Sequence, residues 1–271
     1  MICLSWSVDL LIAQTLDESS RHPLPSPADG LVAVKAAPWH DSFYYLDSHN
    51  LEILAADIHG TVHYRYGGWG SGVDALDLPW ALAVAENSIF VLDQGRNQII
   101  RLDPRLNPVA VTPLPDDRLP IAFVRDIRQR FWVLFEHRAG LYLFDDNGTV
   151  LDVVADETSG AAAVYHPTLL TATPTGIAVW DSVAEEVLGF HLSGNFHWRF
   201  PIKHGGPFLA MASLDASLFL VTEKEILLLN WEDRQLRLLP HSAGFIDLEV
   251  EETELYGLDP GGFLRVLHLN Q

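Results

Sequence analysis

Short runs of apolar residues, separated by short polar breaks, recur along the chain. Residues 79–103 show the pattern most clearly, because the breaks AEN and QGRN divide three runs, ALAV, SIFVLD and QIIRLD. Runs of about four to eight residues that are rich in Val, Ile and Phe and bounded by Asn or Gly are typical of strands joined by hairpins. The segment therefore predicts three successive antiparallel strands.

The second of these runs ends in an acidic residue, and an acidic residue ends an equivalent run five more times. These anchors, separated by 36 to 46 residues, are Asp47, Asp93, Glu136, Asp181, Glu223 and Asp259. Turn-forming glycines follow three of the anchors at an offset of 12 or 13 residues, namely Gly60, Gly148 and Gly194. Asn-Gly pairs such as Asn147-Gly148 are strong hairpin signals. A period of about 45 residues is typical of propeller blades, so six blades are predicted.

Five of the predicted units contain four apolar runs, and the sixth ends after three. An incomplete last sheet leaves an unpaired edge at the closure of a ring, so we expect the N-terminal segment to supply the missing outer strand. Residues 6–14 alternate close to period two and suit this role. The same stretch also fits the end of a secretory signal cleaved near Ala13, although it has no basic region and Asp9 interrupts its apolar run. After such a cleavage the strand would begin at Thr15, where RHPLPSPADG is a poor strand.

Composition narrows the classes of partner. The chain has 271 residues, of which 48% are apolar, and an all-β fold of this size is compatible with a single domain over residues 1–271. A net charge of −19 without any basic cluster excludes nucleic acid and argues against an anionic membrane surface. No apolar run reaches the length of a membrane-spanning helix. The single cysteine, Cys3, allows neither an internal disulfide nor a paired metal ligand.

Residues 68–103 resemble an NHL repeat, in which a Gly-rich lead, a Pro and a strand–Asp–x–x–x–Asn–strand unit follow one another. The residues that carry the resemblance are Gly70, Gly72, Pro79, Ala83, Val84, Val91, Asp93, Asn97 and Ile100. The resemblance implies an all-β, six-bladed β-propeller of the NHL or TolB-like kind, with four-stranded antiparallel blades and a ring closed by the N-terminal strand. It also implies a place outside the cytoplasm, periplasmic or extracellular, with a cytoplasmic protein as the alternative.

The repeated anchors suggest a ring of metal ligands at first sight. A residue that recurs in every blade serves the blade, however, and a carboxylate after a strand accepts N–H bonds from the turn that follows it. We therefore predict that the anchors are structural. The His59 to His63 spacing lacks the helix that a zinc pair of this kind requires.

The resemblance implies that related enzymes hold a divalent cation in the central channel, near the starts of the inner strands. The corresponding positions here are mostly apolar: Trp80, Ile121, Thr168, Phe208 and Ile246. Only Asp29 and Asp247 are acidic there, so no cofactor is predicted and a channel cation is disfavoured. The acid-rich stretch 247–254 fits a cation site and a half-exposed strand alike.

The remaining candidates form an aromatic and polar loop face. They are Trp69, Trp80, Arg96, Asn97, His137, Arg138 and Phe208. Aromatic residues and arginines are favoured in interaction sites. The sequence therefore predicts a monomeric, non-catalytic scaffold that binds a protein or peptide through this face. The alternatives are an enzyme of the lactonase, strictosidine-synthase-like or amidating-lyase type, and a sensor that binds a ligand or cation in the channel.

Overall fold

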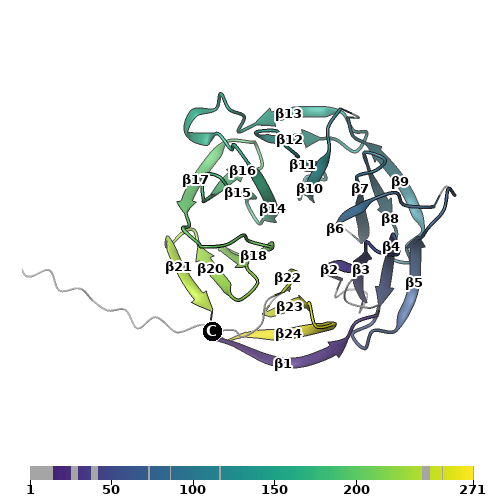
Figure 1. Cartoon of the computed structure of the whole chain (residues 1–271). Helices are drawn as coiled ribbons and strands as arrows, with labels where there is room; N and C mark the ends of the chain where they lie inside the picture. Colours follow the sequence, from purple (N-terminus) through teal and green to yellow (C-terminus); the bar gives the residue numbers. More distant parts are fainter. Residues whose placement is uncertain are drawn as a thin grey trace, which may run out of the picture.

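The structure, a computed structural model, is a ring of six β-sheets around a central axis (Figure 1). It describes residues 15–25, 30–37, 42–72, 74–85, 87–115, 117–239, 245–251 and 253–270. Each sheet has four antiparallel strands, and the chain builds one sheet after another. The predicted six-bladed propeller is confirmed. In the described part of the chain, no helix is long and apolar enough to span a membrane.

The strands of each blade run from the axis outward. Blade 1 comprises β2 (Leu31–Ala37), β3 (Ser42–Asp47), β4 (Glu52–Ala56) and β5 (Val62–Gly67), and blade 2 comprises β6 (Pro79–Ala85), β7 (Ser88–Asp93), β8 (Gln98–Leu102) and β9 (Pro108–Pro113). Blade 3 comprises β10 (Pro120–Arg125), β11 (Phe131–Phe135), β12 (Leu141–Phe144) and β13 (Val150–Val154), and a 3₁₀ turn, η2 (Gly160–Ala162), precedes blade 4. Blade 4 comprises β14 (Pro167–Thr173), β15 (Gly176–Asp181), β16 (Glu186–His191) and β17 (Phe196–Pro201). Blade 5 comprises β18 (Ala210–Leu214), β19 (Ser217–Val221), β20 (Ile226–Asn230) and β21 (Gln235–Leu239), and blade 6 comprises β22 (Asp247–Glu251), β23 (Glu254–Asp259), β24 (Phe263–Asn270) and β1 (Thr15–Pro23).

The N-terminal strand β1 completes blade 6 and closes the ring, as predicted, but its residues differ from those predicted. The strand is Thr15–Pro23 and pairs antiparallel with β24 (Figure 1), whereas residues 6–14 lie outside the described part of the chain. The outermost strand of a blade buries little side-chain surface, so it needs few apolar residues. Polar contacts hold it instead: Glu18 pairs with Arg265, and the guanidinium of Arg21 lies 3.7 Å from the centroid of the Phe263 ring.

The hydrophobic core lies between neighbouring blades. Second strands such as β7 and β15 are buried along their whole length, because both of their faces pack against other blades. This explains why they read as continuous apolar runs. Between blades 2 and 3, the rings of Phe90 and Phe131 meet edge to face with centroids 5.5 Å apart.

The predicted anchors are structural where they are aspartates. Asp47, Asp93, Asp181 and Asp259 are buried and accept backbone N–H bonds. Asp93 and Asp181 also bind N–H groups of the segment that leads into their own inner strand, at Leu78 and Tyr165. Asp47 and Asp259 therefore fix their turns, Asp93 fixes the approach to its inner strand, and Asp181 fixes both.

The two glutamate anchors do not act in this way. Glu136 and Glu223 are exposed, and the expectation that they cap their turns is wrong. In blade 5 the buried Thr222, one residue earlier, accepts the N–H groups of Lys224 and Glu225 on its Oγ1. A glutamate has one more methylene than an aspartate, so its carboxylate does not fit the same tight turn.

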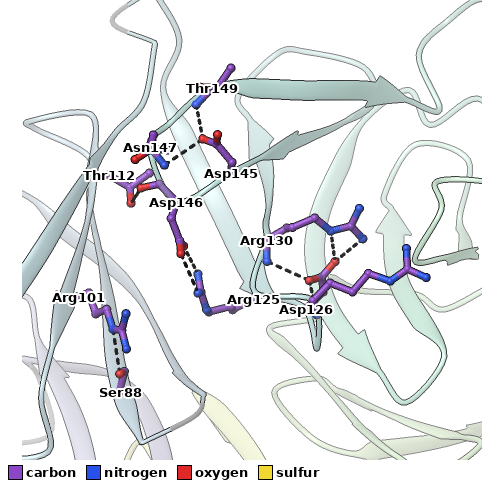
Figure 2. Close-up of polar contacts among 11 residues, drawn as sticks. Ser88, Arg101, Thr112, Arg125, Asp126, Arg130, Asp145, Asp146, Asn147 and Thr149 are labelled. Carbon is purple, nitrogen blue, oxygen red and sulfur yellow. Dashed lines mark hydrogen bonds and ion pairs between the residues drawn. The ribbon is translucent and has the colours of Figure 1, made fainter.

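On the face opposite the turns that follow the anchors, a polar network joins neighbouring blades (Figure 2). Asp126, which follows β10, accepts hydrogen bonds from the side chains of Arg130 and Trp132 and from two backbone N–H groups. The same Arg130 donates to the carbonyl of Leu192 in blade 4, 2.6 Å away. The loops of this face are thus tied to neighbouring blades.

Candidate functional site

The loop face carries the loops between second and third strands and the connections between blades, and the channel opens on it. Strand register assigns one rim residue to each inner strand, at the position before the first regularly paired residue: Val32, Trp80, Ile121, Thr168, Leu209 and Ile246. All six line a cavity of about 730 Å³ in the channel. Five of the six are apolar, so the channel mouth is a hydrophobic rim.

Trp80 is the largest residue of the rim and is 50% exposed. Its indole Nε1 donates to the carbonyl of Ile121 at 2.9 Å, across the joint between blades 2 and 3. Gln94 Nε2 makes a parallel link to the carbonyl of Pro120 at 2.6 Å. The ring of Trp80 is thus held in place by its polar edge while its apolar face stays open to solvent.

A second cavity of about 320 Å³ lies beside Trp80 and extends over blades 3 and 4. Its polar and aromatic wall consists of Glu136, His137, Arg138, Tyr165 and His166. Tyr165 is 56% exposed, and the side chain of His137 is 80% exposed with Nε2 3.7 Å from Glu136 Oε1. Trp80, Ile121 and Thr168 line both cavities, so the side pocket and the channel mouth form one continuous surface.

The carboxylate of the blade 4 anchor, Asp181, and the backbone of the next residue, Ser182, position two residues of this pocket. Asp181 Oδ2 accepts the N–H of Tyr165 at 2.6 Å, and the N–H of Ser182 donates to the carbonyl of His166 at 3.1 Å. The imidazole Nδ1 of His166 also lies 2.9 Å from Ser182 Oγ. The buried carboxylate of Asp181, which belongs to the repeat, therefore orders the segment that presents Tyr165 in the pocket.

The structure brings three of the predicted site residues together and separates the others. Trp80, His137 and Arg138 share the side pocket. Trp69 is 75% exposed in the connection to blade 2 and does not line either cavity. Arg96 Nε lies 3.9 Å from the buried Asp93, and Asn97 adopts a left-handed conformation, with φ 48°, that shapes the turn. Arg96 and Asn97 thus lie in the turn of blade 2, away from the pocket.

Phe208 was predicted at the channel mouth, and this placement is wrong. The ring is buried and packs edge to face against Trp180, with centroids 4.8 Å apart. The rim position of blade 5 belongs to Leu209, because the register pairs Ala210 with Val221. An extended chain turns successive side chains to opposite sides, so a shift of one residue moves the ring from the mouth into the core.

Below the rim, most side chains of the channel wall are small or apolar. The next register level contains Ala33, Ala81, Ala122, Leu169, Ala210 and Asp247, and the level two residues deeper contains Lys35, Ala83, Val124, Thr171, Ala212 and Glu249. Small side chains keep the channel open. All charged residues of these two levels lie on blades 1 and 6, so one wall is ionic and the other is uncharged and mostly apolar.

The ionic wall is a cluster of three groups. Lys35 Nζ lies 2.8 Å from Glu249 Oε2 and 3.4 Å from Asp247 Oδ2. Burial alone would lower the pKa of Lys35, but the two carboxylates outweigh it and raise the pKa above the ordinary lysine value. Burial raises the pKa of Glu249, and Lys35 opposes that shift. The predicted acidic positions behave differently here: Asp247 binds Lys35, and Asp29 lies outside the described residues.

Sequence reasoning did not single out Tyr165, His166 or Lys35. The first two directly precede β14, as Asp77 and Leu78 directly precede β6, so the repeat period offered a signal for them. Lys35 is the single charge in the first inner strand, LVAVKAA, and that also marked it. Among the described residues, no group of three or more His, Cys, Asp or Glu side chains is placed to hold a metal ion.

Comparison with known proteins supports the fold. No family model matches the chain, and no curated protein matches it in sequence. By contrast, 1021 chains of solved structures match it. The relationship of this chain to others is therefore visible in the fold and not in the sequence.

Lyases are among the similar structures. A streptogramin B lyase matches with a TM-score of 0.64 and 12% identity, over 95% of this chain and 98% of the other. A catalytically inactive variant of virginiamycin B lyase from Staphylococcus aureus, solved with quinupristin, matches with a TM-score of 0.67 and 13% identity, over 91% of this chain and 83% of the other. At these identities the likeness shows a shared propeller fold.

A third similar structure belongs to a protein complex. It is BBS1N in complex with ARL6DN, with a TM-score of 0.55 and 15% identity, over 85% of this chain and 74% of the other. The fold therefore occurs in a lyase and in a protein that binds another protein, and fold alone does not choose between them. The NHL resemblance stays a prediction.

Proposed function

We propose that the protein is a non-catalytic scaffold that binds an extended peptide segment of a partner protein at the channel mouth of its loop face. The observation that carries this proposal is Trp80, a half-exposed indole whose polar edge is already bonded to Ile121. A fixed aromatic ring loses little conformational entropy on binding, which is why tryptophans dominate binding hot spots.

The surroundings of Trp80 suit a peptide. Tyr165 adds a second exposed ring, and Arg138 and His137 add donors for backbone carbonyls or acidic side chains. The apolar rim residues Val32 and Leu209 are partly exposed on the other side of the mouth. A central apolar patch with a polar edge is the usual anatomy of a protein interface.

The test is a selection of peptides from a random displayed library on the immobilised protein. We expect selected peptides to lose at least tenfold in affinity when Trp80→Ala is introduced, and a similar amount with Tyr165→Ala. Tyr64→Ala, which removes an exposed ring from the outer strand β5, is the matched control and should leave affinity unchanged. Peptides that bind Trp80→Ala as well as the native protein would refute the proposed site.

A lyase is the second candidate, favoured by the histidines His137 and His166 beside Glu136 in the side pocket. Histidine and carboxylate side chains are the usual proton-transfer groups of such enzymes. Because the lyase neighbours include one solved with quinupristin, the direct test is to incubate the protein with quinupristin and follow its chromatographic retention and fragmentation pattern, since an elimination that opens a ring leaves the mass unchanged. We expect no new product, and turnover that is lost in His137→Ala or His166→Ala would replace the scaffold proposal by the enzyme.

A further inference from the structure

The ionic wall of the channel carries more negative charge than its own lysine neutralises. Two carboxylates, Asp247 and Glu249, face one ammonium, Lys35. Between 16% and 22% of each of these side chains is exposed, so the cluster is open to the channel cavity. One negative charge is thus left over in a partly desolvated place, where an unpaired charge is costly.

An ion pair that served only to join the first and last blades would not need this additional negative charge. Lys35 on β2 and Glu249 on β22 already form a close ion pair across the closure of the ring, and the N–H of Val34 donates to Asp247 Oδ2 at 3.0 Å. Within the described part of the chain, the other oxygens, Asp247 Oδ1 and Glu249 Oε1, accept no further hydrogen bond. Burial raises the pKa of Glu249, so a cation beside its carboxylate would favour the charged form.

The opposite wall indicates what kind of cation fits. At the two levels of the cluster it is uncharged and built mostly from alanines and larger apolar side chains such as Leu169 and Val124, with the hydroxyl of Thr171 as the one polar group among those side chains. Calcium and magnesium require six or more oxygen ligands in a compact shell. An organic cation, by contrast, uses an apolar wall for its stem while its charged end stays with the carboxylates.

The cluster is within reach of the mouth. Asp247 occupies the level directly below the rim, and Glu249 lies two residues deeper. With a rise of about 3.3 Å per residue, the cluster spans about 3 to 10 Å below the level of Trp80. The four-carbon stem of a lysine is suited to that depth.

We propose that the channel binds an organic cation, an ammonium or guanidinium group on an apolar stem, with its charge between Asp247 and Glu249. Two sources supply a cation of this chemistry: a basic side chain of the bound peptide, or a free amine. The first source rests on the proposed function, and the second does not. The cavity of about 730 Å³ has the size of a small-molecule site.

The first experiment measures binding of phenethylammonium to the full chain by titration calorimetry, with phenylethanol and phenylacetate as neutral and anionic matches. We expect the cation to bind and the two matches to bind at least tenfold more weakly. Glu249→Gln and Asp247→Asn keep the shape of the wall, and each should lower the affinity for the cation at least tenfold. Glu157→Gln, an exposed carboxylate outside the channel, is the control for net charge.

The second experiment separates the sources with a Lys-containing peptide selected on the loop face and the same peptide with that lysine acetylated. If the peptide supplies the cation, acetylation and Glu249→Gln each weaken the peptide at least tenfold, and the two losses do not add. If phenethylammonium binds while Glu249→Gln leaves the affinity of every selected peptide unchanged, the ligand of the channel site is a free amine. The proposed function is then tested by the effect of Trp80→Ala alone. Equal binding of phenethylammonium to the native protein and to both channel variants, or no binding at all, overturns the inference.

Discussion

The guanidinium of Arg125 is bound to the carboxylate of Asp146, with Nη1 2.7 Å from Oδ1, at the joint between blades 2 and 3 (Figure 2). The same guanidinium lies 4.7 Å from the ring centroids of both Phe90 and Phe131. Only 1% of the Arg125 side chain is exposed, whereas 53% of Asp146 is. The backbone carbonyl of Asp146 also accepts a hydrogen bond from Thr112 on β9. The ion pair thus joins the inner strand of blade 3 to an outer turn of the same blade, and Phe90 and Thr112 connect the pair to blade 2.

This joint predicts that Arg125→Ala lowers the free energy of unfolding by about 2–4 kcal/mol, because it leaves a cavity between two rings. Arg125→Met keeps the stem between the rings and loses the charge, so it should cost less than the alanine variant. Urea unfolding with an unchanged m-value measures both. An alanine variant as stable as the native protein would show that the guanidinium contributes nothing to the joint.

The difference between aspartate and glutamate anchors predicts a second contrast. Asp93→Asn removes a buried charge that accepts the N–H groups of Asp77 and Leu78, and should cost about 1.5–3 kcal/mol. Glu136→Gln makes the same chemical change at an exposed anchor and should change stability by less than about 0.5 kcal/mol. Thermal unfolding of the two variants side by side checks this. Equal effects of the two changes would contradict the structural role of the buried anchors.

The pH dependence of stability follows from aspartates in tight turns. Hydrogen bonds from the backbone N–H of Thr149 lower the pKa of Asp145. At Asp126, burial alone would raise the pKa, but the hydrogen bonds from Arg130 and Trp132 outweigh it and lower it. A carboxyl whose pKa is lower in the folded state stabilises the protein above its unfolded pKa, and this contribution is lost as the pH falls through the folded value.

We therefore expect the urea midpoint to fall as the pH is lowered from about 4 toward 2. Asp126→Asn should be less stable at pH 7 and show a shallower fall in this range. Glu157→Gln, at an exposed position, should keep the native slope. A native slope in Asp126→Asn would mean that this carboxyl has the same pKa folded and unfolded.

The fold was predictable because every blade repeats the same physical problem. A second strand buried on both faces must be apolar throughout, and in four of the six blades a buried aspartate ends it, so the repeat period can be recognised at residues such as Asp93 and Asp181. The outer strand β1 was misplaced because a strand on the outside of a blade has little apolar surface to bury. Its sequence, TLDESSRHP, is therefore mostly polar, and its pairing with β24 is invisible to a search for alternation.

The candidate site was predictable in part for a different reason. Trp80 and His137 stand at positions that any propeller exposes, so their place followed from the fold. Phe208 was wrong because one residue of register separates the rim from the core, and sequence patterns do not resolve a single residue at a strand start. The pairing of Lys35 with Glu249 joins residues from the first and last blades, and only closure of the ring brings them together.

Closure of the ring by β1 predicts the effect of removing it. A chain that lacks residues 1–23 exposes the edge of β24 and the contacts of the buried Leu16. We expect its midpoint of thermal unfolding to fall by about 10 °C or more, since one kcal/mol corresponds to about 2–4 °C for a domain of this size. Adding the peptide TLDESSRHP should restore part of the loss in proportion to its concentration, because it binds only the folded ring. A scrambled peptide of the same composition is the control. A shortened chain with the native midpoint would show that three strands suffice for blade 6 and that β1 is not needed to hold the ring shut.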